Sequence, residues 1–205
     1  MQKLDYPYEM KKMGITLQIE RNVYPTSQIS ELLIETILEL NKNNIVNKKI
    51  LDYGTGAGFL AIKLASKGAK VVALDINPYA VKCAKNNSKL NNVEIDVRKS
   101  DCLEAINNEK FDIIVAGMPW DNDKAENYME MALFDTNGRM KKELFAKAGE
   151  ILEKDGFILM TYANFMMEIQ PLENFMGENF EYEIVKEKII HDELHYILKI
   201  KTKGD

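Results

Sequence analysis

The feature that most constrains this chain is a short apolar run that ends in glycines at alternate positions, LDYGTGAGFLAI at residues 51–62. The run predicts a buried strand, and the apolar residues after the glycines predict a helix. Gly54, Gly56 and Gly58 allow the backbone between the two to turn tightly and to approach a ligand closely. A bare turn from strand to helix needs fewer glycines than this. The segment therefore predicts a strand, a ligand-binding loop and a helix.

Similar strand and helix patterns alternate along the rest of the chain. Strands are expected at 48–53, 70–75, 93–101, 111–117, 157–163, 180–190 and 193–203, and helices at 27–40, 59–68, 76–90 and 138–156, with a broken helical stretch at 164–176. This alternation is typical of a mostly parallel sheet with helices on both faces, and the last two strands add an antiparallel hairpin. We therefore expect an α/β fold with a doubly wound, Rossmann-like, mostly parallel seven-stranded sheet and an antiparallel C-terminal edge hairpin. One domain is expected over 1–205, with a polar arm at 1–22 and the main fold at 23–205.

Composition narrows the classes of protein to consider. The net charge of -5 and the pI near 5.3 argue against a generally basic nucleic-acid binder, although they leave room for a local basic patch. Cys83 and Cys102 are most simply free thiols in a reducing compartment, and no apolar run approaches the roughly 18 residues of a membrane span. His191 and His195 lie on a predicted turn and strand, so no metal site is expected. These features predict a cytoplasmic protein without a membrane partner.

In a doubly wound sheet the ligand binds at the carboxyl ends of the strands. Asp75 ends the second strand, seventeen residues beyond Gly58, where a carboxylate can accept hydrogen bonds from a ribose diol. Asp101 and Cys102 follow the third strand and are expected to face a purine ring. The alternatives are a solvated aspartate at a strand end for Asp75 and a helix cap for Asp101. Phe59 stands where the dinucleotide fingerprint has its third glycine, which disfavours an NAD-dependent oxidoreductase.

Five segments in order, LDYGTGAG, ALDINPYAV, SDCLEA, FDIIVAGMPW and LEKDGFILM, resemble a class I S-adenosylmethionine-dependent methyltransferase. The resemblance covers roughly Lys48 to Ala163 and implies S-adenosyl-L-methionine as the cofactor. It places Gly54, Thr55 and Gly56 under the methionine part, with Asp52 near the amino group and Gly58 in the same loop. On the nucleoside side it implies Asp75 at the ribose hydroxyls, Ile76 against adenine, Asp101 at the adenine amino group, and the backbone N–H of Cys102 beside it.

Two looser matches point to a subfamily. VYPTSQISELL at 23–33 is similar to the opening helix of release-factor glutamine methyltransferases and of small-domain RNA and DNA amino-methyltransferases, and MALFDTNG at 131–138 resembles a stretch of the glutamine enzymes. Those families carry Asn-Pro-Pro-Tyr or Asp-Pro-Pro-Tyr where this chain has Gly117, Met118, Pro119 and Trp120. The second proline and an aromatic ring are kept, whereas the side-chain oxygen that orients the target NH2 group is lost. The backbone carbonyls of Gly117 and Met118 remain available as acceptors.

The segment Gly117–Trp120 is therefore expected to form the wall that contacts the methyl acceptor. Trp120 is expected to stack on a planar acceptor or face a cation, and the alternative is that its ring caps the edge of the core. The resulting hypothesis is a methyltransferase that acts on an N or O atom of a peptide, a protein or a small molecule. An RNA amino-methyltransferase, for which a nucleic-acid acceptor is less favoured, and a non-catalytic S-adenosylmethionine-binding subunit are the alternatives. Recognition of the acceptor is expected from the N-terminal arm, from 121–138, from 164–176 or from a partner chain.

Overall fold

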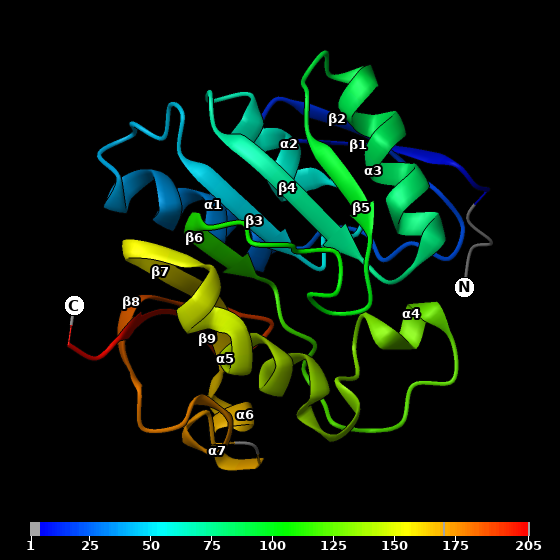
Figure 1. Ribbon diagram of the computed structural model, residues 1–205. Helices are drawn as coiled ribbons and strands as arrows, with labels where there is room; N and C mark the ends of the chain where they lie inside the picture. Colours follow the sequence, from blue (N-terminus) through cyan, green and yellow to red (C-terminus); the bar gives the residue numbers. More distant parts are fainter. Residues whose placement is uncertain (1–4, 170, 205) are drawn as a thin grey trace.

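A seven-stranded sheet forms the centre of the protein, whose computed structural model describes residues 5–169 and 171–204 (Figure 1). In spatial order the strands are β5 (Asp96–Lys99), β4 (Lys70–Asp75), β3 (Lys49–Tyr53), β6 (Phe111–Ala116), β7 (Leu152–Ala163), β9 (Glu193–Thr202) and β8 (Phe180–Ile190). The strands from β5 to β7 run parallel to one another, and β9 is antiparallel to both of its neighbours. The expected sheet, with its antiparallel C-terminal hairpin, is confirmed.

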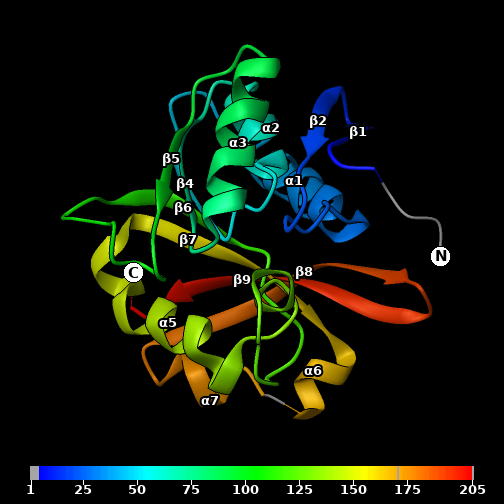
Figure 2. The ribbon, with the colours of Figure 1, turned by 90° about the vertical axis from the view of Figure 1, so that its right-hand side faces the viewer.

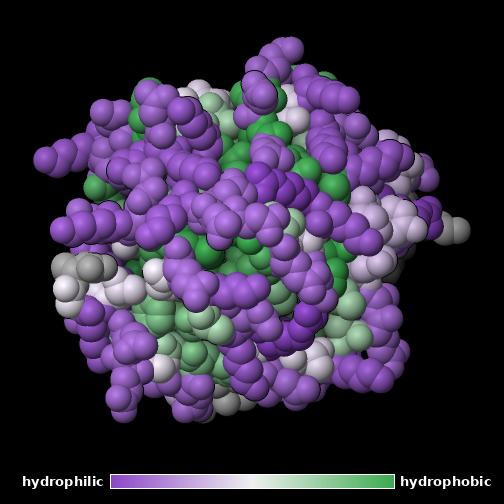
Figure 3. Space-filling model, viewed as in Figure 1, coloured by the Kyte–Doolittle hydropathy of each residue, from purple (hydrophilic) through white to green (hydrophobic). Residues whose placement is uncertain are grey.

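Helices cover both faces of this sheet (Figure 2). On one face lie α1 (Gln28–Leu40), α2 (Phe59–Ala65) and α3 (Pro78–Leu90), and on the other lie α5 (Arg139–Ile151), α6 (Asn164–Ile169) and α7 (Glu173–Met176). Alternate residues of each central strand enter the two hydrophobic clusters, so that β3 gives Ile50 to one and Leu51 to the other. Hydrophilic residues cover most of the surface seen in Figure 3, and hydrophobic residues show between them toward its middle.

The N-terminal segment differs from the polar arm that the sequence predicts for residues 1–22. Strands β1 (Tyr8–Lys12) and β2 (Ile15–Ile19) form an antiparallel hairpin outside the main sheet. The apolar residues of β2 alternate with polar ones and lie buried against α2 and α3. The period of two in ITLQI is the signal of a half-buried strand, and the polar residues on either side obscure it.

Two asparagines on α3 attach this hairpin to the fold. The side-chain oxygens of Asn87 and Asn91 accept from the backbone N–H groups of Gln18 (2.8 Å) and Thr16 (3.0 Å). Their NH2 groups donate to the carbonyl oxygens of the same two residues, at 3.2 and 2.7 Å. Because the asparagines lie one helical turn apart, their amides pair with β2 as a neighbouring strand would. The hairpin therefore directs the chain that follows β2 across the carboxyl ends of the main sheet.

Two helix ends show how the local sequence sets boundaries. Asn77 caps α3 by accepting from the Tyr79 N–H (2.9 Å), and Pro78 occupies the first helical position, as expected. Helix α5, expected to continue to residue 156, ends at Ile151 instead. Asp155 adopts a left-handed φ of 65°, and a side chain at Gly156 would lie 2.7 Å from the Glu153 carbonyl oxygen. Residues 153–156 thus form a bulge inside β7, between the pairing of Leu152 with Phe111 and that of Phe157 with Ile113.

Candidate functional site

The glycine loop between β3 and α2 is held against the end of β4. The N–H groups of Gly54 and Thr55 donate to the carbonyl oxygen of Leu74, at 3.0 and 2.8 Å, and the N–H of Gly56 donates to Asp75 Oδ2 at 2.8 Å. Gly54 and Gly56 have φ values of 87° and 55°, in the region that favours glycine. This conformation brings the bare loop backbone to the carboxyl edge of the sheet.

Gly58, the third glycine, serves the packing of two helices. A Cβ at Gly58 would lie 2.9 Å from the Cβ of Ala84, so the absence of a side chain lets α2 approach α3 closely. Gly58 lines neither of the two cavities described below. The structure therefore gives Gly58 a role in helix packing, and its contact with the cofactor stays a prediction.

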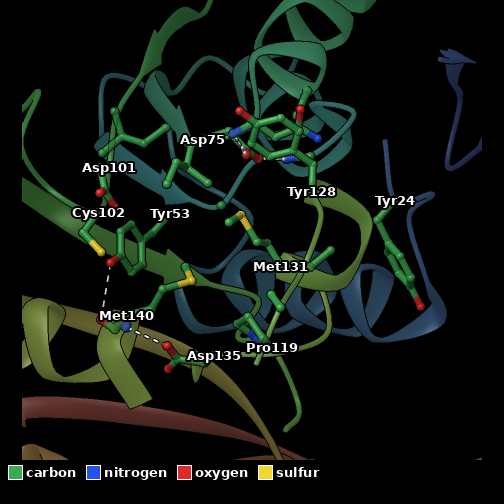
Figure 4. Close-up of a pocket in the computed structure, with 18 of the residues that line it drawn as sticks. Tyr24, Tyr53, Asp75, Asp101, Cys102, Pro119, Tyr128, Met131, Asp135 and Met140 are labelled. Carbon is green, nitrogen blue, oxygen red and sulfur yellow. Dashed lines mark hydrogen bonds between the residues drawn. The ribbon is translucent and has the colours of Figure 1, made fainter. Parts of the chain in front are cut away.

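A cavity of about 240 Å³ opens beside the loop, at the ends of β3, β4, β5 and β6 (Figure 4). Several of the predicted site residues come together in its lining, and these are Gly54, Gly56, Asp75, Ile76, Asp101, Cys102, Gly117 and Pro119. Asp101 and Cys102 lie on one side of the cavity and Tyr24 lies on the other (Figure 4). The sequence-based expectation that strand ends converge on one ligand site thus agrees with the geometry.

A smaller cavity of about 100 Å³ shares Tyr24, Gly54, Gly56 and Gly117 with the larger one. Thr26, Asp52 and Thr55 line it, and each has a buried side-chain oxygen without a hydrogen-bond partner among the described residues. Buried polar atoms without partners are rare in folded proteins and indicate a missing ligand or water. Burial raises the pKa of Asp52 to about 7 against the opposing effect of the neighbouring Thr55 side chain, so a cation in this cavity would favour its ionised form.

These three oxygens fit the amino acid end of S-adenosylmethionine. A carboxylate at Asp52 is a partner for an ammonium group, and the hydroxyls of Thr26 and Thr55 can donate to a carboxylate. Thr26 was missed by the sequence reasoning, although it lies in the VYPTSQIS segment that carries the resemblance. A lone threonine in a turn gives no signal of its own, and only the path of the chain after β2 brings it to the cavity.

Asp75 holds the loop as well as lining the larger cavity. Its Oδ2 accepts from the Gly56 N–H at 2.8 Å, and its Oδ1 accepts from the Asn77 N–H at 2.9 Å. Burial raises the pKa of Asp75 above its usual value, while these two hydrogen bonds act in the opposite direction. An ionised carboxylate offers about four acceptor sites, so Asp75 retains capacity for ribose hydroxyls.

Residues 121–138, which we call the lid, fold back over the larger cavity. The lid closes at its base, where the Trp120 N–H donates to the Leu133 carbonyl (2.8 Å) and the Asp135 N–H donates to the Asp121 carbonyl (2.7 Å). It contains the short helix α4 (Tyr128–Met131) and the 3-10 turn η1 (Thr136–Gly138). The Tyr128 ring meets the Tyr79 ring of α3 edge to face, with centroids 6.1 Å apart. The lid therefore reaches from the end of β6 to the start of α3.

Trp120 lies in the core edge instead of the cavity wall. Its ring stacks on Phe165 with centroids 6.1 Å apart and meets His195 edge to face at 4.9 Å, and it lines neither cavity. Met118 is 3% exposed, and its N–H donates to Thr161 Oγ1 at 3.2 Å. Of the predicted acceptor wall, only Gly117 and Pro119 line a cavity. The packing interpretation of Trp120 agrees with these contacts because neighbouring aromatic rings fix its orientation.

His195 should make the stability of the fold depend on pH. Burial lowers the pKa of His195 below its usual value of 6.5, so the unfolded chain takes up a proton first as the pH falls. The contribution of neutral His195 to the free energy of unfolding is complete above about pH 6.5 and is lost below it. We expect His195→Gln to flatten the pH dependence measured by urea unfolding between about pH 7 and pH 5.5. If the free energy of unfolding changes with pH equally in the wild type and in His195→Gln, this role is contradicted.

Among the described residues, no helix is long and apolar enough to cross a membrane, and no group of His, Cys, Asp and Glu side chains could hold a metal ion.

Comparison with known proteins gives a consistent result. The family model described as methyltransferase small domain matches residues 15–189. A protein from Methanocaldococcus jannaschii, named as a candidate protein N5-glutamine methyltransferase, is 33% identical over 194 residues, which are 90% of this chain and 94% of that protein. A release factor glutamine methyltransferase from Streptococcus pneumoniae is 38% identical over 109 residues, but this match covers 52% of the chain and only 38% of the relative.

Solved structures share the fold at lower identity. A T. thermophilus 16S rRNA methyltransferase in complex with AdoMet and guanosine superposes with a TM-score of 0.72 at 21% identity, over 96% of this chain and 50% of that one. A methyltransferase from Pyrococcus furiosus gives a TM-score of 0.69 at 16% identity, over 93% of this chain and 90% of that one. At these identities the likeness concerns the fold alone.

Proposed function

Because this chain belongs to the methyltransferase small domain family, we propose that it transfers a methyl group from S-adenosylmethionine to a nitrogen atom of a protein or peptide. S-adenosylmethionine is its cofactor, and the chain is an S-adenosylmethionine-dependent methyltransferase. The observation that carries the proposal is the pair of adjoining cavities, whose shared wall includes the glycine loop and Gly117.

Each part of the two cavities has a role in this proposal. Bound S-adenosylmethionine supplies an activated methyl group. Asp52, Thr26 and Thr55 hold the amino acid end in the smaller cavity, and Asp75 holds the ribose in the larger one. Gly117 and Pro119 form the wall along which the acceptor nitrogen approaches. Methyl transfer depends mainly on the distance and direction of this approach, so a rigid wall favours it.

The charge of the lid supports a protein acceptor over RNA. Between 121 and 134 the lid carries four acidic side chains and one basic side chain, and none of the five is buried. The acids are Asp121, Asp123, Glu126 and Glu130, and the base is Lys124. Such a surface repels the phosphates of a nucleic acid, which bind to lysine and arginine. The name of the M. jannaschii relative, which refers to glutamine in proteins, points in the same direction.

A labelling experiment separates the candidate functions. The chain is incubated with S-adenosylmethionine labelled in its methyl group and with a lysate of the source organism, and the product is then treated with protease or ribonuclease. We expect the labelled methyl group to be released by protease and to be unaffected by ribonuclease. Label in RNA would favour the amino-methyltransferase alternative. Binding of S-adenosylhomocysteine without label in any fraction would favour a non-catalytic subunit.

A further inference from the structure

An ion pair joins α5 to the loop after β5 at one end of the larger cavity. Arg139, the first residue of α5, places its Nη2 2.7 Å from Asp101 Oδ2. Both residues line the cavity, although they come from elements that are distant in the sequence. The two side chains are 54% and 35% exposed, and a pair with this exposure contributes only about 0–1 kcal/mol to stability. The ion pair therefore matters more for the orientation of the Asp101 side chain than for the stability of the fold.

The second carboxylate oxygen of Asp101 is the atom of this ion pair that can contact a ligand. Asp101 Oδ1 is buried and has no hydrogen-bond partner among the described residues. An ion pair through Oδ2 limits the rotation of the carboxylate, so it restricts the direction in which Oδ1 points as well. In this cavity an unpartnered carboxylate oxygen accepts a hydrogen bond from an N–H donor and repels a carbonyl oxygen.

The start of α5 is built to keep Arg139 in place. Asp135 accepts from the N–H groups of Met140 (2.7 Å) and Lys141 (3.3 Å), which are the next two residues of the helix. Gly138, just before Arg139, has a φ of 64°, and a Cβ there would lie 2.2 Å from Phe175 Cε1. The first turn of α5 is therefore fixed by the Asp135 carboxylate and by a glycine whose left-handed φ and close contact with α7 both disfavour a side chain.

We propose that Arg139 is a positioning residue that makes the site select an amino-substituted purine over an oxo-substituted one. It orients Asp101 so that Oδ1 accepts from the exocyclic amino group of the nucleobase. The inference rests on the cofactor assignment of the proposed function and concerns only the nucleoside half of the site. It gives Arg139 a role beyond the small stabilisation that an exposed ion pair provides.

The test compares two nucleosides that differ at this one group. Binding of 5′-methylthioadenosine and 5′-methylthioinosine is measured by calorimetry, because neither compound needs the smaller cavity. We expect the wild type to prefer the adenosine compound by at least about tenfold, since the inosine compound sets its carbonyl against a carboxylate oxygen. Arg139→Ala should reduce this ratio to within about threefold of unity, and Arg139→Lys should keep part of it.

Two further variants make the result specific. Asp101→Asn should abolish the preference because its side-chain amide can both donate and accept. Arg98→Ala is the matched control, since Arg98 also forms ion pairs, with Asp96 and Glu109, but lines neither cavity. It should keep the wild-type ratio, and thermal unfolding checks that each variant is folded.

Two outcomes would overturn the inference. One is a wild type that binds both nucleosides equally. The other is an Arg139→Ala protein that keeps the full preference while Asp101→Asn loses it, because Asp101 would then need no partner to read the base. The proposed function can fail separately: a clear preference for the adenosine compound without any protein methylation would contradict the function and leave the role of Arg139 intact.

Discussion

Replacing Asp75 by alanine is expected to weaken the binding of S-adenosylhomocysteine at least about hundredfold, because hydrogen bonds to a charged group contribute about 1.5–3 kcal/mol each. The variant loses the acceptor for the ribose hydroxyls. It also loses the two hydrogen bonds that hold the Gly56 N–H and the Asn77 N–H, at 2.8 and 2.9 Å. The loop beneath the cofactor is therefore released at the same time as a direct contact. Calorimetric titration gives the change in affinity.

Asp75→Asn separates the two contributions. Its side-chain oxygen can still accept one hydrogen bond, whereas its NH2 group opposes one of the backbone N–H groups. We expect its affinity to lie between that of the wild type and that of Asp75→Ala. If Asp75→Ala binds S-adenosylhomocysteine as the wild type does, the hydrogen bonds of Asp75 to the loop serve the fold alone and the ribose is held elsewhere.

Replacing Gly117 by asparagine is expected to raise methyl transfer to a glutamine-containing peptide at least about tenfold, which corresponds to roughly 1.4 kcal/mol. The new side-chain oxygen can accept a hydrogen bond from the amide NH2 group and so orient it along the wall. The fold should tolerate the change within about 1 kcal/mol. Gly117 has no left-handed φ, and a Cβ there would meet no heavy atom within 4 Å.

Gly117→Ala is the control for this experiment. It adds a Cβ atom at the same position but no acceptor oxygen, so any effect of filling space appears in both variants. Transfer to the peptide that rises equally in Gly117→Ala and Gly117→Asn, or in neither, would contradict the role of a side-chain oxygen at this position. Mass spectrometry of the peptide locates the added methyl group.

Apart from α4 and η1, which were not expected, the strands and helices from β3 to β9 follow from the sequence because each has a local signal. Residues 71–74 are all apolar, as the centre of a strand buried on both faces requires, and Asn77 with Pro78 gives the start of the next helix. The convergence of Asp75, Asp101 and Gly117 on one cavity also follows, because parallel strands end at a common edge. Local pattern and sheet topology together suffice for this part of the site.

The features that the sequence reasoning missed depend on contacts between distant segments. Trp120 occupies the position expected for an acceptor-facing ring, but Phe165 and His195 orient it into the core edge. Thr26 reaches the smaller cavity because Asn87 and Asn91 hold the hairpin that precedes it. Neither effect has a signature within a window of ten or fifteen residues.

In the proposed function, ionised Asp52 in the smaller cavity binds the amino acid end of S-adenosylmethionine. Because burial raises the pKa of Asp52 to about 7, this carboxyl group is protonated below that pH and must lose its proton to pair with an ammonium group. The most direct test is therefore calorimetric titration with S-adenosylhomocysteine across this range of pH. The affinity of the wild type should rise more than about tenfold between pH 5.5 and pH 7.5, and Asp52→Asn should bind weakly at every pH. An affinity that is the same at both pH values, or an Asp52→Asn protein that binds as the wild type does, would contradict the claim.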